Sequence, residues 1–226
     1  MPRETFDAQL AALKEQLLNL GASVSNAQKL AVQALADRDD ELARIVIAGD
    51  QAINQEQRDI EERCLFLIAS QQPVARDLRM IVGISAISSD LERMADHAKG
   101  IARLALRLSD QPLLKPLIDV PLMAEIGREL LVGQLQAFMN GDVDAARALA
   151  ARDEETDRLY DQVFRELLMI MMGDPRTITR ATYLLWVAHN LERFSDRTTN
   201  IGERAVFLMT GRVIELNEDR NEDRIR

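Results

Sequence analysis

One stretch of sequence, Asp90-Leu91-Glu92-Arg93-Met94-Ala95-Asp96, occurs twice in the chain. One hundred positions later the sequence reads Asn190-Leu191-Glu192-Arg193-Phe194-Ser195-Asp196, with leucine, glutamate, arginine and the last aspartate at the same spacing. Farther upstream, residues 34–50 align with residues 137–153, which is an offset of 103 positions. The change of offset indicates turns of unequal length, because turns accept insertions most readily. Repetition of this kind predicts two copies of one structural module.

The composition is typical of a helical protein. Hydrophobic residues make up 47% of the 226 residues and aromatic residues only 4%, with few glycines and prolines. Leucine and alanine dominate, and both favour helices. Apolar residues also recur at spacings of four and three, as in Leu10, Leu13, Leu17 and Leu20, which keeps one face turned toward a neighbouring helix. The chain is therefore predicted to be all-α.

Six long helices are expected from this periodicity and from the positions of helix breakers. Their approximate ranges are 6–37, 41–70, 74–108, 122–139, 143–172 and a sixth helix that ends before Gly211. The run Asn140-Gly141-Asp142 predicts a glycine stop followed by a helix cap. Gly173 and Pro175 are expected to bracket the last turn in the same way, with the proline opening the sixth helix.

The helices are expected to form two tandem, pseudo-symmetric three-helix bundles. Short connections make consecutive helices antiparallel neighbours, and the repeat divides the six helices into two sets of three. The three prolines between residues 109 and 121 predict the connection between the modules. The expected division is a first bundle at 1–110, a linker at 111–121, a second bundle at 122–211 and a frayed charged tail at 212–226.

Charge and cysteine content narrow the function classes. The formal net charge of −9 argues against a nucleic-acid partner, which normally requires a basic face. Cys64 is the only cysteine, which excludes a disulfide framework and favours a reducing cytoplasm. No apolar run approaches the length of a membrane span, so we expect no membrane insertion. Without a phosphate-binding glycine loop, a dinucleotide fingerprint or a serine elbow, no catalytic residues are expected.

Acidic side chains stand one helical turn apart in the second module. Asp153 and Asp157 interrupt the apolar face of the fifth helix, where like charges repel and burial adds a desolvation cost. On the sixth helix Glu192 and Asp196 have the same spacing, and Asn200 continues the row. Apolar residues would be more stable than Asp153 and Asp157 on this face of the fifth helix unless something compensates for the repulsion and the desolvation cost. These residues are therefore predicted to bind metal.

The first module carries a related but reduced set. Asp50 and Asn54 correspond to the pair on the fifth helix, and Glu92 and Asp96 to the pair on the sixth, with Gly100 where the second module has asparagine. Oxygen-rich patches suit hard or borderline cations, and acidic pairs from adjacent bundle helices are how di-metal sites are built. We predict one metal-binding patch per module. The alternative is that these acids form an ordinary solvated surface.

The tandem repeat with its Leu-Glu-Arg-x-x-Asp motif resembles the PhoU family of phosphate-signalling proteins. The resemblance covers essentially the whole chain short of the tail, and its most specific parts are residues 76–79, 90–96, 176–178 and 190–196. The acidic motif of the family maps onto Glu92/Asp96, Glu192/Asp196 and Asp153/Asp157. The chain departs from that motif at Asn54, and Gly100 lacks the oxygen that Asn200 supplies. The first patch is therefore expected to be the weaker one.

This resemblance implies a fold of two symmetric three-helix bundles that in some members bind multinuclear iron, zinc or manganese clusters. It also implies negative regulation of phosphate uptake and of the phosphate-starvation response. Such proteins are thought to link the ATPase subunit of the phosphate transporter (PstB-like) to a sensor histidine kinase (PhoR-like), and many are homodimers. We accordingly expect a cytoplasmic, non-enzymatic adaptor. A carboxylate-bridged metal enzyme and a metal-free helical scaffold are the alternatives.

Overall fold

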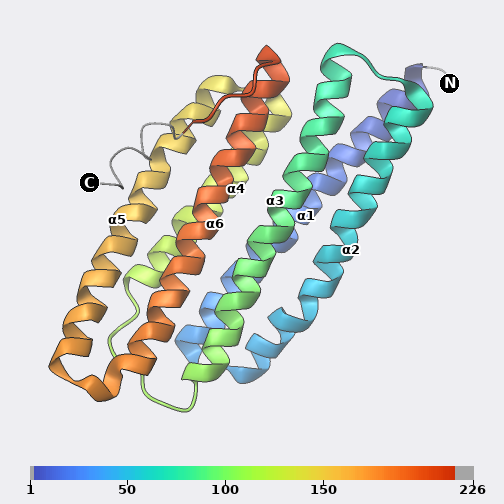
Figure 1. Ribbon diagram of the computed structural model, residues 1–226. Coiled ribbons are helices and arrows are strands. Elements are labelled where there is room, and N and C mark those ends of the chain that lie inside the picture. The colour runs from blue at the N-terminus through green and yellow to red at the C-terminus, as the bar shows by residue number, and fades with distance from the viewer. Residues whose placement is uncertain (1–2, 217–226) are drawn as a thin grey trace.

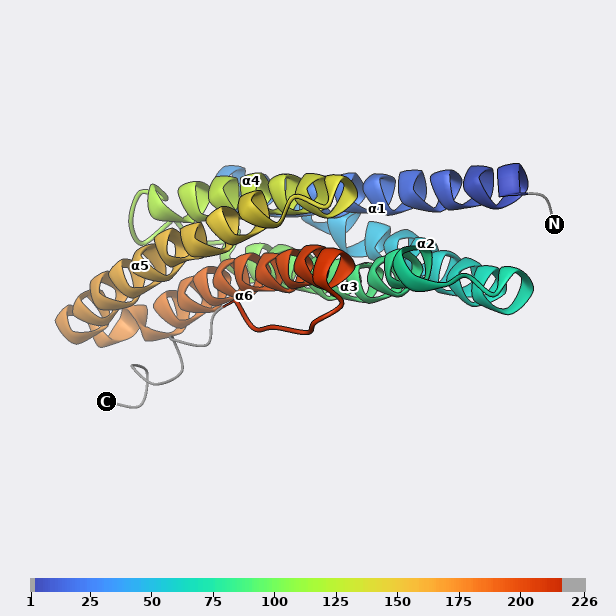
Figure 2. The same cartoon turned by 90° about the horizontal axis from the view of Figure 1, so that it is seen from above.

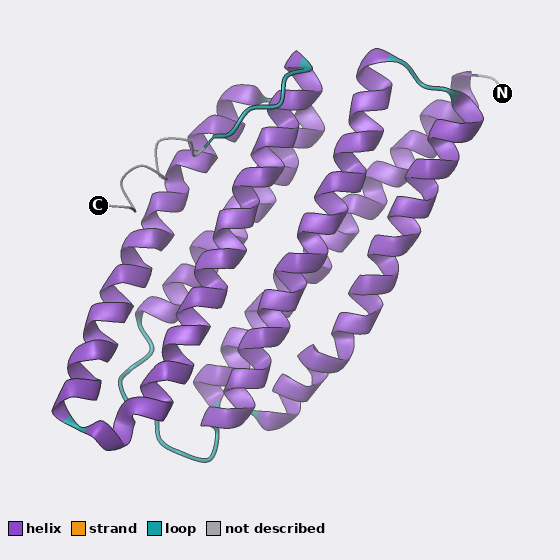
Figure 3. Ribbon diagram, viewed as in Figure 1, coloured by secondary structure: helices purple, strands orange, loops and turns teal. Residues whose placement is uncertain are grey.

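The computed structural model describes residues 3–216, which form six long helices and, within that range, no strand (Figures 1 and 3). The elements are α1 (Arg3–Asp37), α2 (Asp40–Gln71), α3 (Ala75–Leu108), α4 (Asp119–Asn140), α5 (Val143–Gly173), the 3₁₀ turn η1 (Pro175–Thr177) and α6 (Ile178–Thr210). The all-α prediction is confirmed. None of the helices in this range combines the length and apolar character that crossing a membrane requires.

Two aspartates at equivalent positions of the repeat start the middle helix of each module. Asp39 Oδ1 accepts a hydrogen bond from the Leu42 amide at 2.9 Å and caps α2. Asp142 Oδ1 accepts one from the Ala145 amide at 3.0 Å and caps α5. Gly141 ends α4 with a φ of 69°, a left-handed conformation that favours glycine. The predicted glycine stop and aspartate cap are both confirmed.

Two helix ends differ from the predicted ones because of proline. Helix α4 begins at Asp119 rather than at residue 122, since Pro121 lies in its first turn, where the missing N–H of proline has little cost. Asp174, not Gly173, is the C-terminal cap of α5, and Pro175 opens η1 instead of the long α6. Of the predicted charged tail, residues 217–226 lie outside the described part of the chain.

Each module is a three-helix bundle, α1–α3 and α4–α6, in which every helix contacts the other two. The bundles pack side by side, with α3 against α6 and α1 against α4. Figure 2 shows α1 and α4 along one side of the molecule and α3 and α6 along the other. The two facing helices α3 and α6 run antiparallel (Figure 1). The predicted pair of pseudo-symmetric bundles is thereby confirmed.

The apolar core extends through both modules. The buried side chains form two clusters, and each cluster contains residues of all six helices. The boundary between the clusters therefore crosses the long axis of the molecule and does not coincide with the boundary between the bundles. The approach of α1 to α4 requires Gly21, because a Cβ atom there would lie 2.4 Å from Leu135 Cδ1. The two repeats therefore pack around a common interior, which holds α2 against α3 and α5 against α6.

Candidate carboxylate centres

The first predicted patch lies between α2 and α3 and contains a lysine. Asp50 is only 5% exposed, and its Oδ2 atom accepts hydrogen bonds from Lys99 Nζ at 2.5 Å and from Asn54 Nδ2 at 3.3 Å. Lys99 Nζ also lies 3.5 Å from Asp96 Oδ1, one turn earlier on α3. The ammonium group therefore joins the acids of the two helices. The sequence analysis missed Lys99, although its position three residues after Asp96 was a usable signal.

Glu92 completes the predicted set in the first module. Burial raises the pKa of its carboxyl group, and the neighbouring charges of Asp96 and Asp50 raise this pKa further, whereas Arg93 and Lys99 lower it. Carboxylates whose charges act on one another in this way lie within about 10 Å of each other. The structure thus brings Asp50, Glu92 and Asp96 into one neighbourhood.

The second predicted patch is divided between a buried and a more exposed part. Asp153 on α5 and Glu192 on α6 are only 2% and 7% exposed, whereas Asp157 and Asp196 are half-buried. Arg193 Nη1 forms an ion pair with Asp196 Oδ2 at 2.9 Å. Two carboxylates inside a helical bundle carry a desolvation cost that their partners must offset.

Buried hydroxyl groups accompany the acids of the second module. Thr156 Oγ1 on α5 lies 3.1 Å from Ser195 Oγ on α6, and both side chains are fully buried. The repeat equivalents in the first module are Ile53 and Ala95, which are buried and apolar. The interface between α5 and α6 is therefore more polar than its counterpart between α2 and α3.

Asn200, the last predicted ligand, makes its contact with the other module. Its Nδ2 atom donates to Asp90 Oδ1 on α3 at 3.1 Å, and Arg197 Nη1 lies 3.1 Å from the same oxygen. At the equivalent place of the repeat, Asn190 Oδ1 lies 3.1 Å from His97 Nδ1. These two contacts are related by the pseudo-twofold axis and join α3 to α6. The amide nitrogen of Asn200 thus serves the contact between the modules.

The donor types of both patches suit a hard cation, since they are mainly carboxylate oxygens. Nevertheless, no three histidine, cysteine, aspartate or glutamate side chains between residues 3 and 216 are grouped closely enough to hold a metal ion. An ion in the second patch would require its acids to turn toward one another. Metal binding by either patch stays a prediction.

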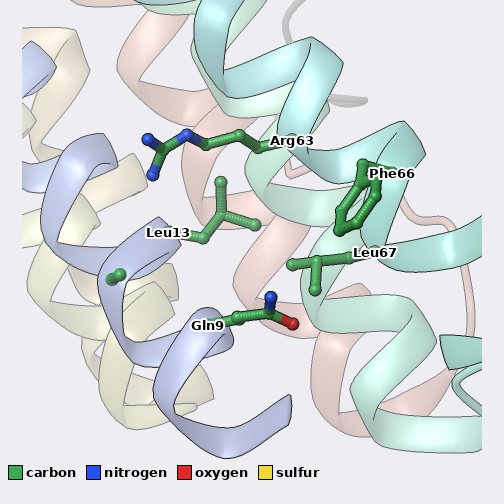
Figure 4. A pocket seen from close by; sticks show the side chains of 6 residues that line it. Gln9, Leu13, Arg63, Phe66 and Leu67 are labelled. Carbon is green, nitrogen blue, oxygen red and sulfur yellow. The ribbon is translucent and has the colours of Figure 1, made fainter. Parts of the chain in front are cut away.

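A surface groove lies between α1 and α2, away from the carboxylates (Figure 4). It is lined by Gln9, Ala12, Leu13, Arg63, Phe66 and Leu67. Arg63 Nη1 donates to Gln16 Oε1 at 3.1 Å across the two helices. None of the predicted site residues lines this groove, so it is a separate feature of the surface.

The two modules match one family description. The PhoU domain matches residues 17–105 and residues 120–205, once in each bundle. The chain belongs to the PhoU family. All nine predicted site residues fall inside these two ranges, as do both copies of the repeated motif, residues 90–96 and 190–196. The resemblance inferred from the motif is confirmed.

Individual PhoU relatives agree over most of the chain. The phosphate-specific transport system accessory protein PhoU homolog of Aquifex aeolicus is 40% identical over 207 residues, covering 92% of this chain and 94% of that protein. The homolog of Streptococcus pneumoniae strain TIGR4 is 37% identical over 215 residues, covering 95% and 100%. The crystal structure of PhoU from Pseudomonas aeruginosa has a TM-score of 0.86 at 36% identity, covering 92% of this chain and all of that one.

Proposed function

We propose that this PhoU-family protein is a non-enzymatic regulator of phosphate homeostasis that restrains phosphate uptake and the phosphate-starvation response. The observation that carries the proposal is the PhoU domain match in both modules. Relatives that align along nearly the whole chain are named phosphate-specific transport system accessory proteins. A similar crystal structure is described as the phosphate transport system regulatory protein PhoU from Streptococcus pneumoniae. These names favour regulation over catalysis.

The protein acts in the cytoplasm by linking the ATPase subunit of the phosphate transporter (PstB-like) to a sensor histidine kinase (PhoR-like). Two similar bundles packed against each other offer two comparable faces, which suits an adaptor between two partners. A second copy of the chain completes the functional unit as a homodimer. The acidic balance of the chain, −9, favours basic surfaces on the partners.

The second carboxylate patch binds the metal ions of this regulator. Asp153, Asp157, Glu192 and Asp196 supply oxygen ligands from α5 and α6, and Asp153 and Glu192 are buried, where a carboxylate carries a desolvation cost. Iron, manganese or zinc bound there holds the two helices together. The first patch, Asp50, Asn54, Glu92 and Asp96, is the weaker counterpart.

Deletion of the gene in its native host tests the regulatory role. We expect the deletion to raise phosphate uptake and to switch on phosphate-starvation genes in phosphate-rich medium, and the wild-type gene to reverse both effects. Purified protein should also co-purify with the transporter ATPase subunit and with the cytoplasmic part of the kinase. A deletion that leaves uptake and starvation genes unchanged would contradict the proposal, whatever the metal content.

Elemental analysis of the purified chain tests the metal assignment independently. The Glu192→Ala/Asp196→Ala variant should lose most of the bound metal, because it removes half of the acids of the second patch. The matched Glu92→Ala/Asp96→Ala variant should lose little. Equal metal content in the wild type and both variants would exclude these residues as ligands, while circular dichroism verifies that each variant is folded.

A further inference from the structure

The first carboxylate patch already contains a positive charge in the position that joins its two helices. Lys99 Nζ lies 2.5 Å from Asp50 Oδ2 on α2 and 3.5 Å from Asp96 Oδ1 on its own helix. The lysine side chain is 19% exposed and that of Asp50 only 6%. A metal ion bound in this patch would likewise bridge carboxylates of the two adjacent helices. Here a side chain of the protein takes that place.

The second patch has a neutral residue at the corresponding position. Thr199 is the repeat equivalent of Lys99, one hundred positions later, and is 2% exposed. The pair Asp153 and Glu192 is nevertheless buried on the facing helices. Of the two patches, only the first therefore has a lysine of its own at this repeat position. This difference was not visible from the acidic motif, which is nearly the same in both copies.

We propose that Lys99 is the resident cation of the first patch, so that its ammonium group replaces a metal ion there and leaves metal binding to the second module. A divalent ion beside Asp50 would meet the ammonium group at close range, and the repulsion would oppose binding. A lysine cannot dissociate, which makes the first module independent of metal supply. The contrast with the second patch rests on the metal assignment proposed above.

Removal of the ammonium group should turn the first patch into a metal site. Asp50 Oδ1 and Asn54 Oδ1 are buried and accept no hydrogen bond from the residues that the structure describes. Together with Asp96 and Glu92, they are oxygen ligands of the kind that Mn²⁺ accepts. Without Lys99, these groups leave a buried negative charge that a divalent ion would compensate.

The experiment compares the full-length wild type with Lys99→Met, Lys99→Arg and the double variant Asp50→Asn/Lys99→Met. Thermal unfolding is followed in EDTA and with added MnCl₂, and bound Mn²⁺ is measured by equilibrium dialysis. Lys99→Met should have a lower melting temperature in EDTA, regain it with Mn²⁺ and bind more Mn²⁺ than the wild type. Lys99→Arg keeps the charge and should gain no Mn²⁺. The double variant, which has neither charge, should lose the Mn²⁺ that Lys99→Met gained.

Two results would overturn the proposal. One is a Lys99→Met protein whose melting temperature and bound Mn²⁺ equal those of the wild type. The other is a wild type that loses Mn²⁺ on Glu92→Ala/Asp96→Ala substitution, since the first patch would then bind metal beside Lys99. If Lys99→Met folds only in the presence of Mn²⁺, its unfolding on EDTA addition is itself the expected outcome.

Wild-type metal content separates this proposal from the metal assignment of the second module. A wild type that binds no metal removes the assignment for Asp153 and Glu192, but the gain of Mn²⁺ by Lys99→Met still decides the role of Lys99. The reciprocal change, Thr199→Lys, should abolish metal binding only if the second patch is a site.

Discussion

The two modules share their backbone plan but differ in the polar groups that hold their helices together. In the first, Lys99 joins the acids of α2 and α3, and Ile53 and Ala95 pack beside them. In the second, Thr156 on α5 meets Ser195 on α6, and both hydroxyl groups are buried. Lys99 contributes a positive charge to the first patch, whereas its repeat equivalent in the second patch is the neutral Thr199. The two copies of the repeat thus share one fold but differ in the polar side chains between their helices.

The same separation occurs at the contact between the modules. Asp90 meets Arg197 and Asn200 on one side of the pseudo-twofold axis, and Asn190 meets His97 on the other. Geometrically these are one contact made twice. Chemically the first is an ion pair and the second a neutral hydrogen bond. Substitutions at the two equivalent positions therefore measure how much the charge contributes to the free energy of unfolding, because the surrounding backbone is nearly the same in both.

The largest expected effect is at Asp90. Asp90→Ala leaves Arg197 with an uncompensated charge at a site where the two side chains are only 11% and 17% exposed. Removing one partner of such a buried pair costs about 3 kcal/mol of unfolding free energy. The equivalent Asn190→Ala removes a neutral contact and should cost about 1 kcal/mol. Urea unfolding of both variants measures the difference.

Equal losses in Asp90→Ala and Asn190→Ala would mean that the charge of the first contact contributes nothing beyond packing. The double variant Asp90→Asn/Arg197→His is the matched control, because it converts the first contact into a copy of the second. Its stability should lie between those of the wild type and Asp90→Ala.

The next effect concerns the buried hydroxyl pair of the second module. Ser195→Ala or Thr156→Val alone leaves one hydroxyl without its partner in a fully buried place, at a cost of about 1–2 kcal/mol. Thr156→Val/Ser195→Ala removes both and restores the apolar character that Ile53 and Ala95 give to the first module. It should be less destabilised than the sum of the single variants. Strict additivity in a double-mutant cycle would contradict a direct interaction between the hydroxyls.

Most of the fold followed from local signals that act within a few residues. Asp39 and Asp142 cap helices through amides three residues away, and the apolar spacing fixes which face of each helix is buried. Those signals occur twice in the repeat, which made the two-bundle prediction possible. Pro121 shows the limit of such reasoning, because a proline breaks a helix interior but is accepted in its first turn.

The candidate site was predicted less completely, since it depends on how distant segments meet. Lys99 bridges Asp50 on α2 and Asp96 on α3, so the acidic rows of these adjacent helices lie near each other. The bridge from Lys99 to Asp50 spans 49 positions and depends on the register of α3 against α2. The contact of Asn200 with Asp90 depends on packing between the modules, about which helical periodicity carries no information.

A smaller effect is expected at Gly49, beside the first patch. This exposed glycine lies inside α2, and an added Cβ atom would meet nothing within 4 Å. Gly49→Ala should therefore raise the unfolding free energy by about 1 kcal/mol, because alanine favours helices over glycine. Gly133 in α4 is the control: a Cβ there would lie 2.8 Å from Leu149 Cδ1, so Gly133→Ala should gain less. A gain at Gly133 as large as at Gly49 would show that steric space does not decide the outcome.

The smallest expected effect is the pH dependence of stability that His97 causes at the second contact between the modules. Burial lowers the pKa of His97 below its ordinary value of 6.5, and the hydrogen bond with Asn190 opposes that shift, while the nearby charges of Arg197, Arg193 and His189 add to it. The unfolded chain therefore takes up a proton first as the pH falls. Stability contributed by neutral His97 is complete above pH 6.5 and is lost as the pH drops from there through the folded-state pKa.

His97→Gln keeps an N–H donor for Asn190 but removes the titration. Relative to the wild type, it should gain stability progressively as the pH is lowered from 6.5, measured by urea unfolding across that range. His189→Gln is the matched control, because the pKa of His189 is also lowered but its side chain is 54% exposed, so its substitution should flatten the profile less. Parallel profiles for the wild type and His97→Gln would show that the folded structure does not favour neutral His97. Any loss of stability in acid that survives His97→Gln must come from other groups.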